Sequence, residues 1–510
     1  MVSPNLTVMD YSSGTVVAAK PILRAFRDSM WHGMGGFADY ENYDALGLAG
    51  LIAAGEVSAA EVLDEAIERT DAHNPTLNAV VQRCDDVARQ RAAESLPDSP
   101  LAGVPFLIKD IVYQRGLPST SGSRLFADFV PDHDAELVRR YHAAGLLLFG
   151  RTNTPEFGLT TTTEPALYGP CRNPWNLEHT TGGSSGGAGA AVAAGIVPAA
   201  HATDGGGSIR IPAACCALVG LKPTRARNPV GPDVGEGWGG MSIGHVVSRT
   251  VRDSAAFLDA THGPLQGDPY FAPAFDGSYL AACADAPGAL RIALDLAPLT
   301  GVDADPACVE AARHAAALCE SLGHHVQEAS PDFDRRELLT ATGVIVAANV
   351  AYQIDTRLTV LGRELATDDI EAATRQTLEY GRAVTGTEYV KAIQVLHRTA
   401  RVVADFHQRY DLMLTPTLVS PPVPLGWLDT RDDDQSSYGE RFRNFWGFTN
   451  LQNATGQPAI SVPLFWTEGD LPVGVQFVGR VGADLTLLQL AAQLEQVQPW
   501  FERRPSLGGH

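Results

Sequence analysis

Two glycine-serine loops lie close together between residues 180 and 224, and they offer the groups of an acyl-transfer site. The first loop is Gly182-Gly-Ser-Ser-Gly-Gly187 and the second is Asp204-Gly-Gly-Gly-Ser208. Glycines let backbone N–H groups approach a ligand closely, and several such groups beside a serine are what an oxyanion hole requires. Because serine is a weak nucleophile on its own, the pattern also requires a base elsewhere in the chain.

Four interpretations of these loops can be compared through the residues that flank them. A phosphate loop is excluded because no GxxxxGK(S/T) motif is present, and residues 187–189 lack the third glycine of a dinucleotide-binding turn. Residues 182–186 fit the GxSxG elbow of α/β-hydrolases, but that elbow follows a strand and residues 173–181 are typical of a loop. Turns without chemistry are disfavoured, because two such loops flank one small-residue helix. A serine hydrolase with a lysine base is the fourth interpretation.

The paired loops resemble the amidase signature family, whose motif joins GGSSGG to a downstream D-x-G-G-S-(I/V)-R. Here the second part is residues 204–210, and Ser184 and Ser208 are 208 − 184 = 24 residues apart. Residues 103–110 match the block that carries the family's lysine, and further matches fall at 150–157, 168–175, 220–224, 456–463 and 471–476. The resemblance covers roughly residues 45 to 505 and is strongest to bacterial amidases of the 6-aminohexanoate cyclic-dimer hydrolase kind.

The resemblance implies a Ser–cis-Ser–Lys triad. By position, Ser208 is the nucleophile, Ser184 is the bridging serine in a cis peptide bond, and Lys109 is the base. The expected oxyanion donors are the backbone N–H groups of Gly205, Gly206, Gly207 and Ser208, and the expected supporting residues are Ser185, Asp204 and Arg210. The family often has threonine or another non-glycine residue at position 205, so Gly205 is a departure that could loosen the oxyanion loop.

Each of these residues also has an ordinary structural interpretation. Lys109 follows an apolar strand, where burial would lower its pKa and let the amine accept a proton, but it could equally be a solvated lysine. Ser185 could only cap the next helix, and Asp204 with Arg210 could be a surface pair. Both His201 and His245 are interpreted as structural, because a lysine mechanism needs no histidine.

An apolar substrate pocket is predicted from aromatic and aliphatic residues near the motifs. The candidates are Ser123, Phe126, Tyr168, Trp238, Met241, Ile243, Ile345, Trp446 and Phe448. Any one of them could be ordinary core, but together they favour a hydrophobic or aryl amide as substrate. Carbamates and esters undergo the same acyl transfer, so both stay open as substrates.

The elements that must position these residues alternate between strand and helix. Strands are expected at 101–110, 146–149, 289–294, 412–414, 459–464 and 473–478, and helices after Ser58, at 134–144, after Asp305 and at 485–494. This order predicts one large α/β domain, residues 43–510, with a mixed central sheet covered by helices on both faces. Residues 1–42 are expected to be an N-terminal extension, and Asp429 to Ser437 a polar surface loop.

Composition excludes several classes of protein. The net charge of −21 would repel phosphate backbones, so a nucleic-acid partner is not expected. No run of about 18 apolar residues and no signal peptide is visible, so a cytoplasmic protein without a membrane partner is expected. The seven cysteines form no CxxC pair and indicate reduced thiols. Nothing indicates a metal or another cofactor, and the chain is expected to be a monomer or homodimer.

Together these features favour a serine amidohydrolase that cleaves amide C–N bonds of small-molecule substrates through an acyl-enzyme. Two alternatives stay open. One is the amidase subunit of a tRNA-dependent amidotransferase, because the shared motifs do not separate it from other amidases. The other is a catalytically inactive homologue that only binds, which is disfavoured because Ser208, Ser184 and Lys109 are all present.

Overall fold

A mixed sheet of eleven strands forms the centre of the part of the chain that the structure, a computed structural model, describes: residues 37, 39–432 and 434–507. In order across the sheet, the strands are β1 (Val80–Arg83), β3 (Leu147–Thr152), β2 (Pro105–Lys109), β6 (Ala199–Asp204), β8 (Ile243–Ser248), β7 (Val219–Lys222), β12 (Ala459–Trp466), β13 (Pro472–Gly479), β11 (Leu412–Pro416), β9 (Arg291–Leu294) and β10 (His325–Glu328).

Parallel pairs lie toward the two ends of the sheet and come from β-α-β units, whereas the edge strand β1 is antiparallel to β3. Strands β2 and β3 pair in parallel around helix α5 (Glu136–Ala143), and β9 and β10 pair in parallel around α10 (Pro306–Ser321). Between β6 and β11 the neighbouring strands are antiparallel. The predicted β-α-β order is therefore confirmed, and the sheet is mixed.

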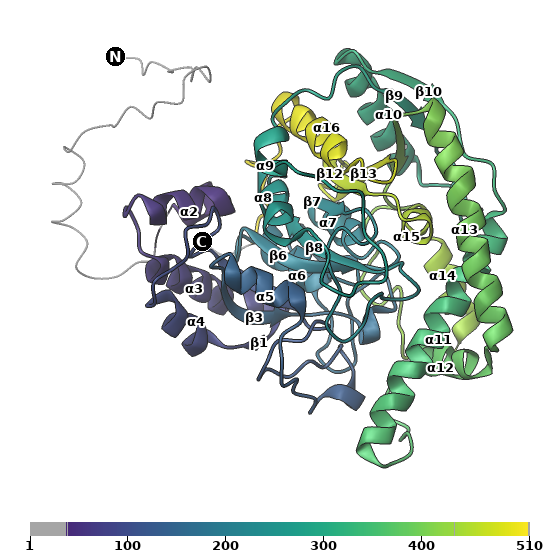
Figure 1. Cartoon of the computed structure of the whole chain (residues 1–510), viewed down its shortest axis with the longest axis horizontal. Coiled ribbons are helices and arrows are strands. Elements are labelled where there is room, and N and C mark those ends of the chain that lie inside the picture. Colours follow the sequence, from purple (N-terminus) through teal and green to yellow (C-terminus); the bar gives the residue numbers. More distant parts are fainter. Residues whose placement is uncertain (1–36, 38, 433, 508–510) are drawn as a thin grey trace.

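Helices cover both faces of the sheet, as alternate residues of β11 show. Leu412 and Leu414 belong to a core that contains residues of α10 and α16, whereas Met413 belongs to a core that contains residues of α11 and α13. In Figure 1, α2 to α4 lie beside β1 and β3, and α11 to α13 lie on the opposite side of the molecule. The predicted single α/β domain with helices on both faces is confirmed.

The remaining helices lie mainly between the strands in sequence. They are α2 (Ala45–Ala53), α3 (Ala59–Leu77), α4 (Asp85–Ala92), α6 (Gly186–Ala193), α7 (Arg210–Cys216), α8 (Val251–Thr261), α9 (Tyr279–Ala282), α11 (Arg335–Leu361), α12 (Ala372–Ala383), α13 (Gly386–Arg409), α14 (Gln435–Arg443), α15 (Asn450–Thr455) and α16 (Asp484–Val497), with short 3-10 turns at Tyr40–Asn42, Arg124–Phe126 and Glu156–Gly158.

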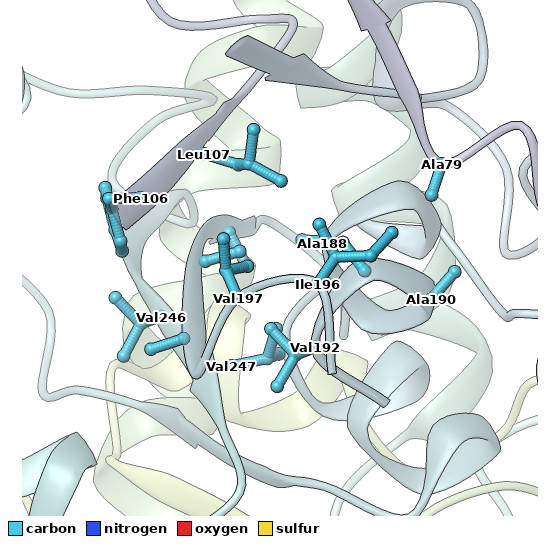
Figure 2. Packing of buried hydrophobic residues seen from close by; sticks show 14 of the residues in the cluster. Ala79, Phe106, Leu107, Ala188, Ala190, Val192, Ile196, Val197, Val246 and Val247 are labelled. Atoms are coloured by element: carbon cyan, nitrogen blue, oxygen red, sulfur yellow. The ribbon is translucent and has the colours of Figure 1, made fainter. Parts of the chain in front are cut away.

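Small residues let α6 pack closely on the strands that carry the site. Ala188, Ala190 and Val192 of this helix lie with Val197 and Val246 in one buried cluster, which Figure 2 shows together with Phe106 and Leu107 of β2. Every residue of α6 is buried, and a Cβ on Gly187 would lie 2.3 Å from the backbone nitrogen of Asn153. The alanine-glycine composition of this segment therefore serves close packing directly beneath the two glycine-serine loops.

Local start signals place several helices as predicted. Ser58 and Glu61 form the expected capping box at the start of α3, and the Asp305 side chain accepts a hydrogen bond from Ala307 N at the start of α10. The polar segment 429–437 is only partly a loop, because Asp434 caps α14 through Ser437 N. The prediction of a loop there overlooked this aspartate as a capping residue.

Residues 173–181 also differ from the predicted loop. They contain β5 (Asn176–Thr180), which pairs with β4 (Arg172–Asn173) in a two-stranded sheet separate from the main one. A strand therefore does precede the first glycine-serine loop, but it is not part of the large sheet on which an α/β-hydrolase elbow is built. The polar residues of this short hairpin show no hydrophobic alternation, which is the pattern that would have indicated a strand.

The predicted N-terminal extension lies mostly outside the described residues. At its end, Tyr40 is buried and its hydroxyl donates to the Ile196 carbonyl at 3.1 Å. Judged by length and composition alone, helix α11 is long and apolar enough to cross a membrane. However, half of its apolar 18-residue stretch is buried inside the protein, as in the core helices of globular proteins.

Candidate active site

A cavity of about 210 Å³ lies where β2 and β6 end and β8 begins, and both predicted serines line it. Ser208 follows the second glycine loop and is partly exposed to the cavity, whereas Ser184 is buried in its wall. Thr203 and Gly205, from the end of β6 and the loop after it, complete this side. The two loops that the sequence places 24 residues apart thus meet at one cavity.

Lys109 ends β2 and is fully buried beside the bridging serine. Its Nζ donates to Ser184 Oγ at 2.7 Å and to Thr203 Oγ1 at 2.9 Å. Burial lowers the pKa of Lys109 to about 7, and the negative charge of Asp204 opposes part of this effect. A large share of the amine is therefore neutral near pH 7, as a proton acceptor must be.

The backbone around Ser184 is closely packed and hydrogen-bonded. The Gly183–Ser184 peptide bond is cis, and Thr154 Oγ1 donates to the Ser184 carbonyl at 2.8 Å. Gly183 leaves no room for a side chain, because a Cβ there would lie 2.6 Å from the Thr162 carbonyl oxygen. The Ser184 hydroxyl itself is held by Lys109 Nζ, and Ser184 lines the cavity.

A buried ion pair supports the nucleophile loop. Arg210 donates to both carboxylate oxygens of Asp204 at 2.9 Å, and neither side chain is exposed. Burial alone would raise the pKa of Asp204, but Arg210 outweighs it and holds the pKa at about 2. Arg210 also donates to side chains of the C-terminal segments: Gln452, Asn453 and Gln476. The interpretation as a surface pair does not hold.

Gly207 differs from the other expected oxyanion donors. Its N–H donates to Asp204 Oδ1 at 2.7 Å, while the neighbouring Gly206 carbonyl accepts from Thr449 Oγ1 at 2.6 Å and from Trp446 Nε1 at 3.1 Å. A peptide N–H and the carbonyl of the same unit point in opposite directions, so these bonds turn the Gly207 N–H away from the cavity. Gly205, Gly206 and Ser208 have N–H groups without an acceptor in the described part of the chain.

Gly205 makes room for an aromatic ring. A Cβ at this position would lie 2.7 Å from Trp238 Cε3. Trp238 lines the cavity beside it, so the additional glycine accommodates the indole.

Ser185 does not act only as a helix cap. Its hydroxyl bonds with the backbone N and O of Thr203, both at 3.3 Å, and makes no cap bond to α6.

Of the nine predicted pocket residues, only Trp238 and Ile243 line the cavity. Ser123 donates to Glu156 at 2.6 Å, and the Tyr168 hydroxyl lies 3.1 Å from both Gln82 and Thr120, so their polar groups are used elsewhere. The others lie in cores or brace the loop: Phe126, Met241, Ile345, Trp446 and Phe448.

Most of the lining comes from segments that carry no motif. These residues are Ile111, Val112, Ala135, Leu137, Gly158, Pro229, Val230, Gly231, Val234, Gly237, Ser242, Gly244 and Gln353, together with His201, whereas Phe157 ends the block 150–157. The segment 229–244 is rich in glycine and proline and has no periodicity, so no sequence pattern indicates its position. His201, interpreted as structural, also reaches the cavity.

Comparison with known proteins agrees with this architecture. The family model described as Amidase matches residues 61–488, so the chain belongs to the amidase family, hydrolases that act on amide C–N bonds. A 6-aminohexanoate-cyclic-dimer hydrolase from Paenarthrobacter ureafaciens is 39% identical over 477 residues, which are 91% of this chain and 96% of the relative. A structure of 6-aminohexanoate cyclic dimer hydrolase complexed with substrate superimposes with a TM-score of 0.86 at 37% identity, covering 92% of this chain and 99% of that one.

The amidotransferase alternative is less well supported by similarity. The structure of a glutamyl-tRNA(Gln) amidotransferase subunit from Thermotoga maritima has a TM-score of 0.71 and 25% identity, covering 92% of this chain and 97% of that one. Both the TM-score and the identity are below those of the cyclic-dimer hydrolase. The chain is therefore an amide hydrolase of the amidase family, and it is more similar to the cyclic-dimer hydrolase than to the amidotransferase subunit.

Proposed function

We propose that this amidase hydrolyses uncharged amides with Ser208 as nucleophile, Ser184 as bridging serine and Lys109 as base. The observation that carries the proposal is the 2.7 Å contact between the buried Lys109 Nζ and Ser184 Oγ, beside a cavity that Ser208 also lines. A lysine with a pKa near 7 can accept a proton at neutral pH, and the serine between the two groups can relay it.

Acylation begins with the transfer of two protons. Neutral Lys109 takes the Ser184 hydroxyl proton while Ser184 takes the proton of Ser208, and Ser208 Oγ forms a bond to the carbonyl carbon of the amide. The negative charge that develops on the carbonyl oxygen is stabilised by backbone N–H groups of the second loop. Gly205, Gly206 and Ser208 supply these groups, because Gly207 is engaged by Asp204.

Collapse of the tetrahedral intermediate breaks the C–N bond. The proton held by Lys109 returns through Ser184 to the leaving nitrogen, so the amine departs neutral and Ser208 carries the acyl group. A water molecule then attacks the ester carbonyl and gives its proton to the same relay. As the bond between Ser208 Oγ and the acyl carbon breaks, the relay returns that proton to Ser208 Oγ. The products are a carboxylic acid and an amine, and the triad returns to its starting protonation state.

The cavity favours a substrate without charge. Its lining contains aliphatic and aromatic side chains, serines, a threonine, a glutamine and a histidine, but no aspartate, glutamate, lysine or arginine among the described residues. Burying an unpaired charge there would be costly. The relative named a 6-aminohexanoate-cyclic-dimer hydrolase makes that neutral cyclic diamide the first substrate to test. Aryl amides follow, and neutral esters and carbamates share the same acyl chemistry.

Hydrolysis of a small panel tests the proposal. The panel contains 6-aminohexanoate cyclic dimer, an aryl anilide, a short aliphatic amide, glutamine and an aryl carbamate, with wild type beside Ser208→Ala and Lys109→Ala. Both variants should lose about three orders of magnitude or more in kcat/KM on every accepted substrate. Lys222→Met is a matched control, because Lys222 is also a fully buried lysine with a pKa lowered to about 7 by burial, and it bonds to the Pro223 carbonyl rather than to a serine.

The outcomes separate the competing accounts. Full activity in Ser208→Ala would contradict the nucleophile, and equal losses in Lys109→Ala and Lys222→Met would reduce Lys109 to a structural residue. A folded wild type that is silent on the whole panel and does not react with a fluorophosphonate would favour the inactive homologue. Copurification of amidotransferase subunits, with glutamine as the only substrate, would favour the amidotransferase.

A further inference from the structure

His201 presents a buried hydrogen-bond donor to the cavity that the proposed mechanism does not use. Its Nδ1 accepts the backbone N–H of Lys109 at 3.4 Å, so the ring proton must be on Nε2. The residue is completely buried, and its Nε2 has no partner in the described part of the chain. Because buried N–H groups are almost always paired, a donor of this kind at a ligand cavity points to a ligand acceptor.

The strand directs His201 to the same side as the reaction centre. Alternate residues of a strand face one side, so His201, Thr203 and Gly205 line the cavity, whereas Asp204 faces its partner Arg210. Thr203 contacts Lys109 Nζ and therefore marks the position of the triad. His201 lies two residues earlier, about 7 Å deeper along the strand.

Gly244 on the neighbouring strand lies beside the imidazole and has no side chain to cover it. Thr203 of β6 pairs with Gly244 of β8, and a Cβ at position 244 would lie 3.2 Å from His201 Nε2. A side chain at this position would crowd the nitrogen. Leu137 Cδ1 would lie 2.6 Å from the same Cβ, and both Gly244 and Leu137 line the cavity where the substrate is proposed to bind.

The chemistry of this donor selects a neutral acceptor. Burial, together with the nearby Lys109, Arg151 and His245, lowers the pKa of His201 to about 3, so the ring is uncharged at neutral pH. No charged side chain of the described residues lines the cavity, so a carboxylate would find no counter-charge. A carbonyl oxygen of an amide or ketone fits such a donor.

We propose that His201 is a positioning residue whose Nε2–H binds a second carbonyl oxygen of the substrate, about one strand repeat from the scissile bond. The substrate class is then neutral amides that carry a further carbonyl group, such as cyclic diamides. This inference rests on the proposed function for the location of the scissile bond. It adds a specificity determinant that neither the triad nor the oxyanion donors supply.

A pair of substrates tests this role in turnover. One is a cyclic diamide, and the other is the ring-matched lactam in which two methylene groups replace the second CO–NH group. Wild type should prefer the diamide by roughly tenfold to a hundredfold in kcat/KM, mainly through KM, and His201→Phe should abolish that preference. His245→Phe is the matched control, because His245 is a buried histidine on β8 that pairs with Ser254 and does not line the cavity.

A binding measurement keeps the inference separate from the mechanism. In the Ser208→Ala variant, which leaves His201 unchanged, the diamide should shift the Nε2–H resonance of the 15N-labelled His201 ring, and the lactam should not. Binding of both ligands without any shift, or equal affinity for the two, would overturn the proposal even if the triad is correct. Conversely, persistent turnover in Ser208→Ala with a diamide-specific shift would overturn the mechanism and leave the role of His201 standing.

Discussion

At the scale of single residues, catalysis is proposed to depend on a lysine that burial keeps partly neutral. Lys109 has two hydroxyl partners, Ser184 and Thr203. Burial lowers its pKa, and the negative charge of Asp204 acts in the opposite direction and raises it. Both hydroxyls can accept a hydrogen bond from the amine without supplying a counter-charge. The site can therefore hold an amine in the form that takes up a proton, which a carboxylate partner in direct contact would prevent.

The pH dependence of activity should report the titration of Lys109. Because its pKa is lowered to about 7, we expect kcat/KM for an uncharged substrate to rise with pH up to about 7 and to level off above it. Lys109→Arg, whose guanidinium stays charged, should be inactive across the whole range. Initial rates between about pH 5 and 9 measure the profile, and a flat profile in wild type would contradict the role of Lys109 as base.

Gly205 should tolerate no side chain while Trp238 is present. A methyl group at this position would approach Trp238 Cε3 to 2.7 Å, so Gly205→Ala should displace the indole or the oxyanion loop and lower kcat/KM by about tenfold or more. Gly343→Ala is the control, because nothing lies within 4 Å of a Cβ at that position. If the loop is displaced by this clash, the double variant Gly205→Ala/Trp238→Ala should recover part of the rate; no recovery would exclude the clash as the cause.

At the scale of elements, the turn from β6 into α7 is fixed by Asp204. Its carboxylate accepts from the N–H groups of Gly207 and Ile209 and from Arg210, so one side chain determines the path of the nucleophile loop. Arg210 extends the same network to α15 and β13. Helix α15 and strand β13, which are far from Asp204 in sequence, are thereby connected through Arg210 to the residue that precedes the oxyanion donors.

Removing this carboxylate should destabilise the fold. Asp204→Asn leaves Arg210 buried without a counter-charge, so the free energy of unfolding should fall by about 3–5 kcal/mol in urea titrations. Asp411→Asn, which breaks a largely exposed pair with Arg291, should cost less than about 1 kcal/mol. Equal losses of unfolding free energy in the two variants would show that the buried Asp204–Arg210 pair stabilises the fold no more than the exposed pair does.

The same ion pair gives stability a defined dependence on pH. The pKa of Asp204 is lowered from 3.8 to about 2 in the folded state, so its contribution is fully present above about pH 4 and is lost as the pH falls toward 2. Wild type and Asp204→Asn should therefore converge in stability as the pH is lowered through this window. Unfolding curves that stay parallel down to about pH 2 would contradict the depressed pKa.

At the scale of the whole molecule, the site depends on segments from nearly the entire chain. Lys109, Ser184 and Ser208 could be proposed from the sequence because each lies in a contiguous motif, and the structure places Lys109 against Ser184 and both serines at one cavity. Apart from Trp238 and Ile243, the cavity lining could not, because Gln353 of α11 and most of the segment 229–244 reach it only through tertiary packing that leaves no local pattern. The engagement of Gly207 by Asp204 likewise depends on loop conformation rather than on residue type.

We also propose that the first 36 residues are dispensable for activity, because the family model matches 61–488 and every site residue lies after position 104. A chain of residues 37–510 should keep wild-type kcat/KM. A chain of residues 44–510 should be less stable by about 2–4 kcal/mol, because it lacks Tyr40, which is buried and bonds to Ile196 before β6. Thermal unfolding and rates of both chains check this, and inactivity of the 37–510 chain would contradict it.

The proposed mechanism requires that Ser208 becomes covalently acylated, and mass spectrometry of the peptide that contains it can detect this step. Wild type treated with a fluorophosphonate, or quenched during turnover of an amide, should carry the added mass on Ser208 and on neither Ser184 nor Ser185. The adduct should be absent in Ser208→Ala and form far more slowly in Lys109→Ala. An adduct on Ser184, or undiminished labelling of Ser208→Ala, would contradict the mechanism.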